Sequence, residues 1–457
     1  MIVKRQCAVV SLGALLVLVL SANVYFVYII VDDTAPYGSA TSHVSGGKSE
    51  RSRPYTLLSR GEQVAPGFYR NTTMTAAYHI EAKLASLPLK YRTISPRHGR
   101  LLQQLLEPMN KSTTVDTSQW AIAAKWVNAR EVMPAWAPQL GSMLHTLCSS
   151  RILHADNALQ GTQLKLILTL AGGQRAIFKP QWYSREAIIQ GPVYAGKDRH
   201  NAEVAAFHLS LALGLRRCPL TVGRKLNLRR ELIPVASDNL LDTFYQEGNN
   251  TCFYGVCYYC SPQDPVCAQK DVLEGALIMW LSPGKLKKLR SPWQRTYKAG
   301  VAARWELDEQ YCDKVKASKL YRPDLSPRLL DLVDTALFDF LIDNGDRHHY
   351  EVFDNWSHSA VLLLDNGKSF GNPHLDHVDI LAPLYQCCIL RKSTWQRLRQ
   401  FSGGVLGSTL GALLEHSHIS PVLAAAHLRA LDRRLMTTFA AVEQCFSRYG
   451  RSSVLLS

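Results

Sequence analysis

The stretch Ile342–Gly371, IDNGDRHHYEVFDNWSHSAVLLLDNGKSFG, decides the fold of this chain. It contains Asp346 in a polar loop, Glu351 five residues later, and Asp365 directly after an apolar run. We expect that run, 360–364, to be a short buried strand that ends in a turn at Asp365. A solvated acidic loop is the simpler interpretation of the same residues. The apolar run between the carboxylates favours a positioned acidic site instead.

The order and spacing of these residues are those of a protein-kinase active site. There, a loop Asp receives the proton of the acceptor hydroxyl, a polar residue five positions later serves metal or phosphate, and the Asp of Asp-Phe-Gly holds the metal. This chain has Glu351 where kinases have Asn, and Asn366 where they have Phe. Phosphoryl transfer depends on positioned carboxylates and metal more than on particular neighbours, so both changes are compatible with it.

A β-hairpin is predicted upstream. Leucines alternate with other residues over 164–170, Gly172-Gly173 forms a turn, and Arg175–Lys179 returns as the partner strand. Lys179 ends Ala-Ile-Phe-Lys, which resembles the kinase strand whose Lys contacts ATP phosphates. A Lys at a strand end is more often only solvated, so this motif needs support from elsewhere.

The support comes from a predicted helix over Asn201–Leu215, with Glu203 in its first turn as the ion-pair partner of Lys179. A strand Lys, a helix Glu and two Asp then follow in kinase order. The apolar segment Glu274–Leu281 suits the hinge between two lobes. The basic and aromatic segment Lys285–Arg304 suits contact with a sugar or an anion, or is a solvated surface connection.

Composition limits the partners and the compartment. The net charge of +15 suggests a surface that attracts polyanions, but no nucleic-acid-binding motif is present, and we expect no nucleic-acid partner. An apolar run over 7–31 follows Lys4 and Arg5 and is long enough to span a bilayer. Charge placement predicts a cytosolic tip and signal anchor over 1–33 with the remainder luminal; a cleaved signal peptide is the alternative.

Three further regions follow the anchor. We predict a flexible luminal stem over 34–117, with short helices near 75–87 and 100–106, a catalytic domain over 118–450 and a tail over 451–457. The glycosylation sequons begin at Asn71, Asn110, Asn249 and Asn355.

Eight of the 11 cysteines lie after residue 250. A Cys-x2-Cys pair could bind zinc. The irregular spacing and an oxidising lumen favour disulfides, whose pairing the spacing alone does not give.

Several motifs closely resemble the secretory-pathway atypical kinases, a family that contains a Golgi casein kinase and a glycosaminoglycan xylosylkinase. They are GTQLK (161–165), IFKP (177–180), DRHNAEVAAFHL (198–209), CFYGVCYYC (252–260), GDRHHYE (345–351), LLDNGKSFG (363–371) and LAPLYQCC (381–388). The resemblance covers about 118–449. The segments at 193–196 and 291–300 look like the xylosylkinase branch, which phosphorylates the 2-hydroxyl of xylose in the proteoglycan linker.

The resemblance implies a two-lobed α+β kinase-like fold whose mostly helical C-lobe is cross-linked by disulfides. It also implies ATP with manganese or magnesium as cofactors, Golgi membrane localisation as a single-pass type II protein, and pairing with itself or a relative. By motif, it makes Asp346 catalytic and Asp198 and Asp365 metal ligands. The implied nucleotide contacts are Gln163, Lys179, Ile278, Met279, Trp280, Leu281, Glu351 and Asp365. The implied disulfides join Cys252 to Cys267 and Cys257 to Cys260, and join Cys312 and Cys445 each to one of Cys387 and Cys388.

Three functions remain open at this point. The first is a luminal kinase acting on the xylose of the proteoglycan linker. The second is a secretory-pathway protein kinase for Ser in Ser-x-Glu motifs, whose acidic peptides would suit a basic surface. The third is a non-catalytic pseudokinase activator, which the presence of every catalytic carboxylate disfavours. One departure from the family is Gly345, where relatives usually carry a larger apolar residue, and it is expected to loosen the loop.

Overall fold

A computed structural model describes residues 72–109, 114–282, 284–298 and 300–457. The predicted anchor over 1–33 and the sequons at Asn71 and Asn110 lie outside these residues. Within the described residues, no helix combines the length and hydropathy that a bilayer crossing requires. Asn249 and Asn355 both lie in exposed turns, as glycosylation requires.

One lobe is built on an antiparallel sheet in the order β1-β2-β3-β8-β4. Its predicted hairpin is present: β2 pairs with β3 through Leu166 opposite Phe178, and both turn glycines have positive φ. The alternating leucines of β2 are fully buried, because one face of the sheet packs on the core. The strands of this sheet are β1 (Ile152–Asn157), β2 (Leu166–Leu170), β3 (Arg175–Pro180), β4 (Thr221–Asn227) and β8 (Val272–Met279).

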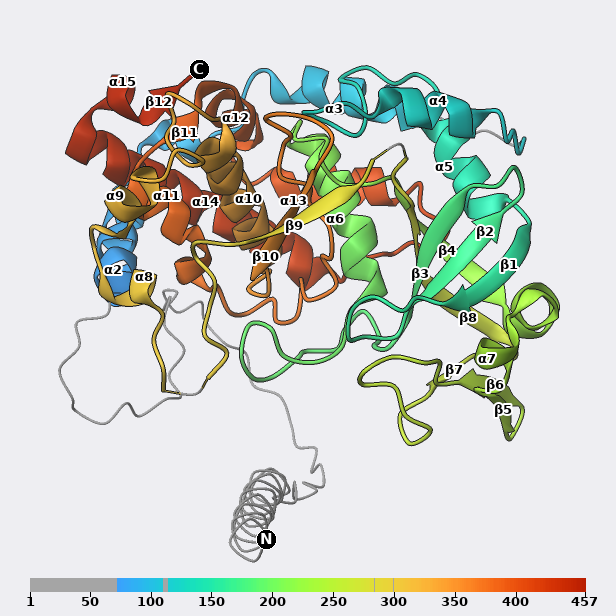
Figure 1. Cartoon of the computed structure of the whole chain (residues 1–457). Helices are drawn as coiled ribbons and strands as arrows, with labels where there is room; N and C mark the ends of the chain where they lie inside the picture. The colour runs from blue at the N-terminus through green and yellow to red at the C-terminus, as the bar shows by residue number, and fades with distance from the viewer. Residues whose placement is uncertain (1–71, 110–113, 283, 299) are drawn as a thin grey trace, which may run out of the picture. The chain divides into compact units, whose positions relative to one another are not determined.

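The other lobe is mostly helical. Figure 1 shows α6 in green between the sheet and the orange and red helices, and it contacts β4, β8 and α13. The sheet lobe carries α4 (Gln119–Trp126), α5 (Leu140–Ser149), α6 (His200–Ala212) and α7 (Asp238–Leu241). The helical lobe includes α8 (Arg304–Leu307), α9 (Tyr311–Lys316), α10 (Arg328–Ile342), α11 (Ala382–Cys387), α12 (Lys392–Leu398), α13 (Leu406–Leu414), α14 (Ala425–Tyr449) and α15 (Arg451–Val454). The helix predicted over Asn201–Leu215 is present as α6, and every residue of α6 is buried, so it is covered on all sides.

The segment predicted as a flexible stem is ordered from Thr72 to Met109. It forms α2 (Thr72–Ala85) and α3 (His98–Leu106), and α2 packs against α14. Tyr91 between them is fully buried and stacks on Phe439 of α14 at 4.7 Å. The helices predicted near 75–87 and 100–106 are therefore present, but the flexibility expected of this part of the stem is wrong, because α2 and Tyr91 pack on the distant α14. The predicted tail is also packed, since β12 (Leu455–Leu456) pairs with β11 (Leu390–Arg391).

Residues 360–363 are buried and Leu364 is partly buried, but the run is not the predicted strand. Its backbone bonds go to three different partners: Ala360 N–H donates to Ala129, Leu362 N–H to Glu351, and Leu363 N–H to Arg217. A strand ladder needs one continuous partner, so the run is an irregular buried segment.

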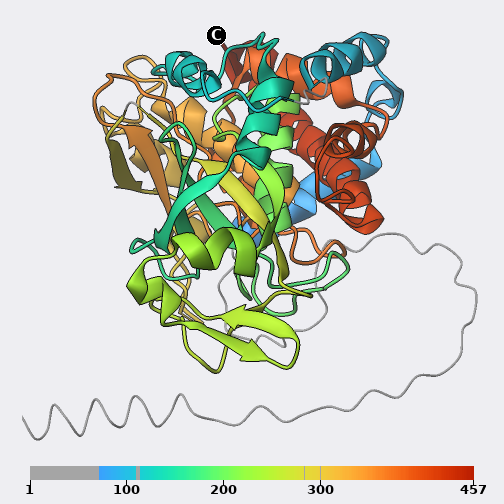
Figure 2. The same ribbon diagram turned by 90° about the vertical axis from the view of Figure 1, so that its right-hand side faces the viewer.

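A separate sheet carries the cysteine-rich insert. It consists of β5 (Phe244–Glu247), β6 (Asn250–Phe253) and β7 (Val266–Cys267), drawn in yellow-green beside the main sheet in Figures 1 and 2. Disulfides join Cys252 to Cys267 and Cys257 to Cys260. In the helical lobe, disulfides join Cys312 to Cys387 and Cys388 to Cys445. All the implied pairings are present, and the adjacent cysteines cross-link α11 to α9 on one side and α14 on the other.

The cross-link between Cys388 and Cys445 should contribute strongly to stability. It closes a loop of 57 residues, and loss of such a loop constraint costs about 2–5 kcal/mol. We expect Cys445→Ser to lower the free energy of unfolding by that amount, measured by denaturant titration under non-reducing conditions. Cys148→Ala is the control, because it removes a buried free thiol without opening a loop. Equal losses in both variants would contradict a role for the cross-link.

Candidate active site

Lys179, near the end of β3, lies at the centre of three carboxylates. Its Nζ donates to Asp198 Oδ2 at 2.9 Å, to Glu203 Oε1 at 2.7 Å and to Asp365 Oδ1 at 2.5 Å. The predicted pair with Glu203 is therefore present. The structure adds that both predicted metal ligands, Asp198 and Asp365, also converge on this one ammonium group.

The charges of this group stabilise one another. Burial would lower the pKa of Lys179, but Asp198, Asp365 and Glu203 outweigh it and raise the pKa well above its usual value. The ammonium group of Lys179 in turn lowers the pKa of Asp365. The side chain of Asp365 is 71% exposed, whereas that of Lys179 is 5% exposed. The ionised Asp365 therefore has an open side toward solvent.

Asn366 explains why this chain differs from Asp-Phe-Gly. Its backbone N–H donates to Glu203 Oε1 at 2.9 Å, and its side-chain amide lies 3.3 Å from Oε2. Arg347 donates to Asn366 Oδ1 at 2.8 Å and forms a bidentate pair with Asp339 of α10. A phenylalanine would keep the backbone bond to Glu203 but could make neither of the two side-chain bonds, to Glu203 Oε2 and from Arg347. Sequence reasoning missed the roles of Asn366 and Arg347, because the bonds join segments far apart in the chain.

Close packing brings the Asp198 segment to the Asp365 turn. A Cβ on Gly367 would lie 2.6 Å from Asp198 Cγ, so only glycine permits this approach. The backbone N–H of Arg199 donates to Gly367 O at 2.7 Å, and its side chain bonds Ser369 O. The two acidic side chains thus reach one site from turns that are fixed to each other.

Asp346 lies in the loop after α10, as predicted. Its Oδ1 accepts a hydrogen bond from the Tyr297 hydroxyl at 2.7 Å. Burial raises the pKa of Asp346, although Tyr297, His348 and Lys368 oppose this; the charge of Asp365 adds to the rise. The charges of Asp365 and Lys368 therefore both affect the pKa of Asp346. It has the environment of a carboxylate that can accept a proton.

We expected the small Gly345 to loosen the loop, but the loop is closely packed at this position. A Cβ on Gly345 would lie 2.0 Å from Val193 Cγ1, so the Val193 side chain fills the space that a larger residue would need. Arg295 also donates to Gly345 O at 3.1 Å.

The remaining predicted nucleotide contacts lie on three different segments of the chain. Gln163 is half-buried in the loop between β1 and β2, and Ile278–Leu281 covers the end of β8 and the residues after it. Both backbone groups of Trp280 are engaged, with Arg175 O and the Gln174 amide, each at 3.0 Å. The N–H of Trp280 is therefore not available to adenine, whereas its carbonyl oxygen has a second lone pair that can accept a further hydrogen bond.

Glu351 belongs to β10 (His349–Phe353), which pairs with β9 (Leu286–Arg290) of the basic and aromatic segment. Burial raises the pKa of Glu351. In the same segment Trp293 and Trp305 are buried, so these indoles are not free to stack on a sugar.

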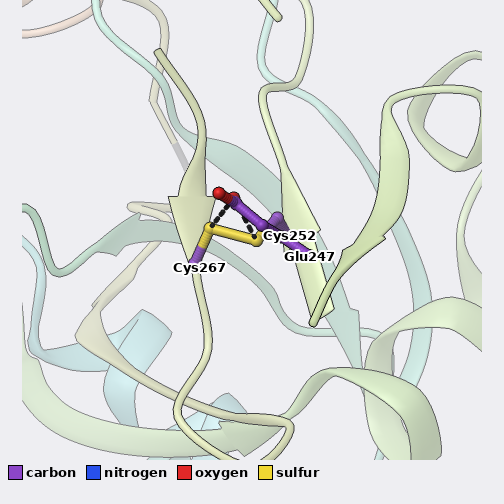
Figure 3. A group of neighbouring side chains, drawn as sticks. All are labelled: Glu247, Cys252 and Cys267. Atoms are coloured by element: carbon purple, nitrogen blue, oxygen red, sulfur yellow. Dashed lines mark hydrogen bonds between the residues drawn. A yellow bond between two sulfur atoms is a disulfide. The ribbon is translucent and has the colours of Figure 1, made fainter. Parts of the chain in front are cut away.

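A group of Glu247, Cys252 and Cys267 resembles a metal site by proximity, as Figure 3 shows. The two sulfur atoms form a disulfide, however, and the metal ligand would be a thiolate. Among the described residues, the predicted disulfide interpretation therefore replaces the zinc alternative. The carboxylate oxygens of Asp198 and Asp365 are instead the hard ligands that manganese or magnesium prefers. In this structure both carboxylates contact the ammonium group of Lys179.

The sheet lobe, the helical lobe and the acidic centre together define a kinase-like protein. Residues 118–454 match the family model described as Golgi casein kinase, C-terminal, Fam20. The chain belongs to this Fam20 family. It is 54% identical over 341 residues to the glycosaminoglycan xylosylkinase of Homo sapiens, covering 74% of this chain and 83% of that protein.

Two solved structures of the family are similar. The structure of hydra Fam20 with sugar has a TM-score of 0.70 and 43% identity, covering 74% of this chain and 97% of that one. The Golgi casein kinase with Mn/ADP bound has a TM-score of 0.70 and 31% identity, covering 88% of this chain and 96% of that one. The predictions of the family, of a kinase-like fold and of ATP and Mn²⁺ as the family's cofactors are confirmed.

Proposed function

We propose that this protein is a phosphotransferase that moves the ATP γ-phosphate to the 2-hydroxyl of xylose in the glycosaminoglycan–protein linkage region of proteoglycans. The observation that carries this proposal is the 54% identity with a glycosaminoglycan xylosylkinase, in a chain that retains Lys179, Glu203, Asp346 and Asp365. The retained carboxylates disfavour the pseudokinase alternative.

Each residue then has a chemical task. Asp346 takes the proton of the acceptor hydroxyl, and Lys179, held by Glu203, orients the phosphates. Asp198 and Asp365 would hold Mn²⁺, which offsets the negative charge of the transferring group. Gln163, Glu351 and the segment Ile278–Leu281 would contact the nucleotide.

We place the catalytic domain in the Golgi lumen behind the predicted type II anchor, in keeping with the Golgi casein kinase among its relatives. Disulfides in both lobes suit an oxidising compartment. The same proposal includes pairing with itself or with a relative. It also includes glycosylation at Asn71, Asn110, Asn249 and Asn355.

The test offers two acceptors to the secreted luminal chain with ATP and Mn²⁺: a galactosyl-xylose glycoside and a Ser-x-Glu peptide. We expect phosphate on the glycoside, at the xylose 2-position by NMR. Phosphate on the peptide alone would make the protein a Ser kinase, whose acidic substrates the net charge of +15 would suit. Absence of manganese-dependent turnover with both would support the pseudokinase.

A further inference from the structure

Tyr297 contacts the proton-accepting carboxylate directly. Its hydroxyl donates to Asp346 Oδ1 at 2.7 Å and also lies 3.3 Å from His348 Nδ1. Its ring packs against Tyr194 at 4.7 Å and against the His348 ring at 5.7 Å. Burial and the negative charge of Asp346 raise the pKa of Tyr297, so the phenol remains a donor throughout the working pH range.

The backbone at Tyr297 is held in an uncommon conformation. Its φ is +57°, a left-handed value that bulky residues rarely adopt and that surrounding contacts must enforce. Those contacts come from the same segment: Arg295 bonds Gly345 O and pairs with Asp379, and Trp293 Nε1 donates to Gln386 at 2.8 Å. The segment is thereby attached to the helical lobe on one side and to the Asp346 loop on the other.

We propose that Tyr297 is a positioning residue, which fixes one oxygen of Asp346 so that the other oxygen faces the acceptor hydroxyl. A carboxylate on a loop can rotate, and a hydrogen bond to one oxygen removes that freedom. The bond also favours the ionised form that a proton acceptor requires. This inference rests on the proposed function for its rate effects, but the contact with Asp346 is testable without any substrate.

The experiment compares Tyr297→Phe, which keeps the ring and removes the hydroxyl, with the wild-type protein. We expect kcat for the glycoside to fall about 10- to 100-fold with little change in the KM for ATP, because nucleotide contacts are untouched. Loss of a bond to the ionised form raises the pKa of Asp346. The acid limb of the rate profile should therefore move to higher pH in the variant. Tyr449→Phe, an exposed position at the end of α14, is the matched control.

A second measurement separates this inference from the proposed function. NMR titration of carboxyl-¹³C aspartate, with Asp346 assigned from Asp346→Asn, should show a higher pKa for Asp346 in Tyr297→Phe. If wild-type protein phosphorylates neither acceptor, the proposed function fails. The titration still tests whether Tyr297 bonds Asp346, because it needs no substrate. An unchanged Asp346 pKa, or an active variant with wild-type kcat and pH profile, would overturn the inference.

Discussion

Asp346→Asn should reduce phosphate transfer to the xylose acceptor by about 100- to 10,000-fold, which is the usual contribution of a general base. The amide oxygen of asparagine can still accept the bond from Tyr297, so the loop should keep its conformation. An amide cannot take up the proton of the acceptor hydroxyl. The measurement is the initial rate with saturating ATP and Mn²⁺.

Two comparisons make this result specific. Binding of Mn–ATP, measured by the shift in Tm, should be retained in Asp346→Asn, because Lys179, Asp198 and Asp365 are unchanged. Asp313→Asn, an exposed position on α9, should leave the rate unaffected. A rate within about 10-fold of wild type would remove Asp346 from its assigned role.

Lys179→Met should affect both stability and activity. The variant leaves Asp198, Glu203 and Asp365 without their shared cation, and Glu203 is only 3% exposed. Removing one partner of a buried ion pair costs about 3–5 kcal/mol, so the Tm should fall clearly. Phosphate transfer should fall at least about 100-fold, because a positioned charge on the transferring group is lost.

Manganese distinguishes this explanation from a general packing defect. If Asp198 and Asp365 bind Mn²⁺, the ion should raise the Tm of Lys179→Met more than that of wild type, since it replaces the missing positive charge. Lys225→Met, at an exposed position on β4 of the same sheet, is the control and should change neither property. A Tm that does not respond to Mn²⁺ in either protein would contradict the assigned metal ligands.

Local patterns predicted the elements whose signals lie within a few residues. The hairpin of β2 and β3 follows from alternating leucines and two glycines. The helices predicted near 75–87 and 100–106 are present as α2 and α3, but their packing was not predicted, because α2 packs on α14, more than 300 residues away in the chain. Trp293 of the basic and aromatic segment is buried for the same reason, since the distant Gln386 accepts the bond from its indole.

The sequence by itself determined the order of the chemical groups: Lys179, Glu203, Asp346 and Asp365 stand in kinase order, and the family motifs surround them. How these groups meet depends on the packing of distant segments. Asn366 holds Glu203, Val193 fills the space beside Gly345, and Tyr297 bonds Asp346. Spacing along a chain fixes which face of a helix or strand a residue occupies. A contact between distant segments depends on how whole elements pack, and one sequence carries no local signal for that.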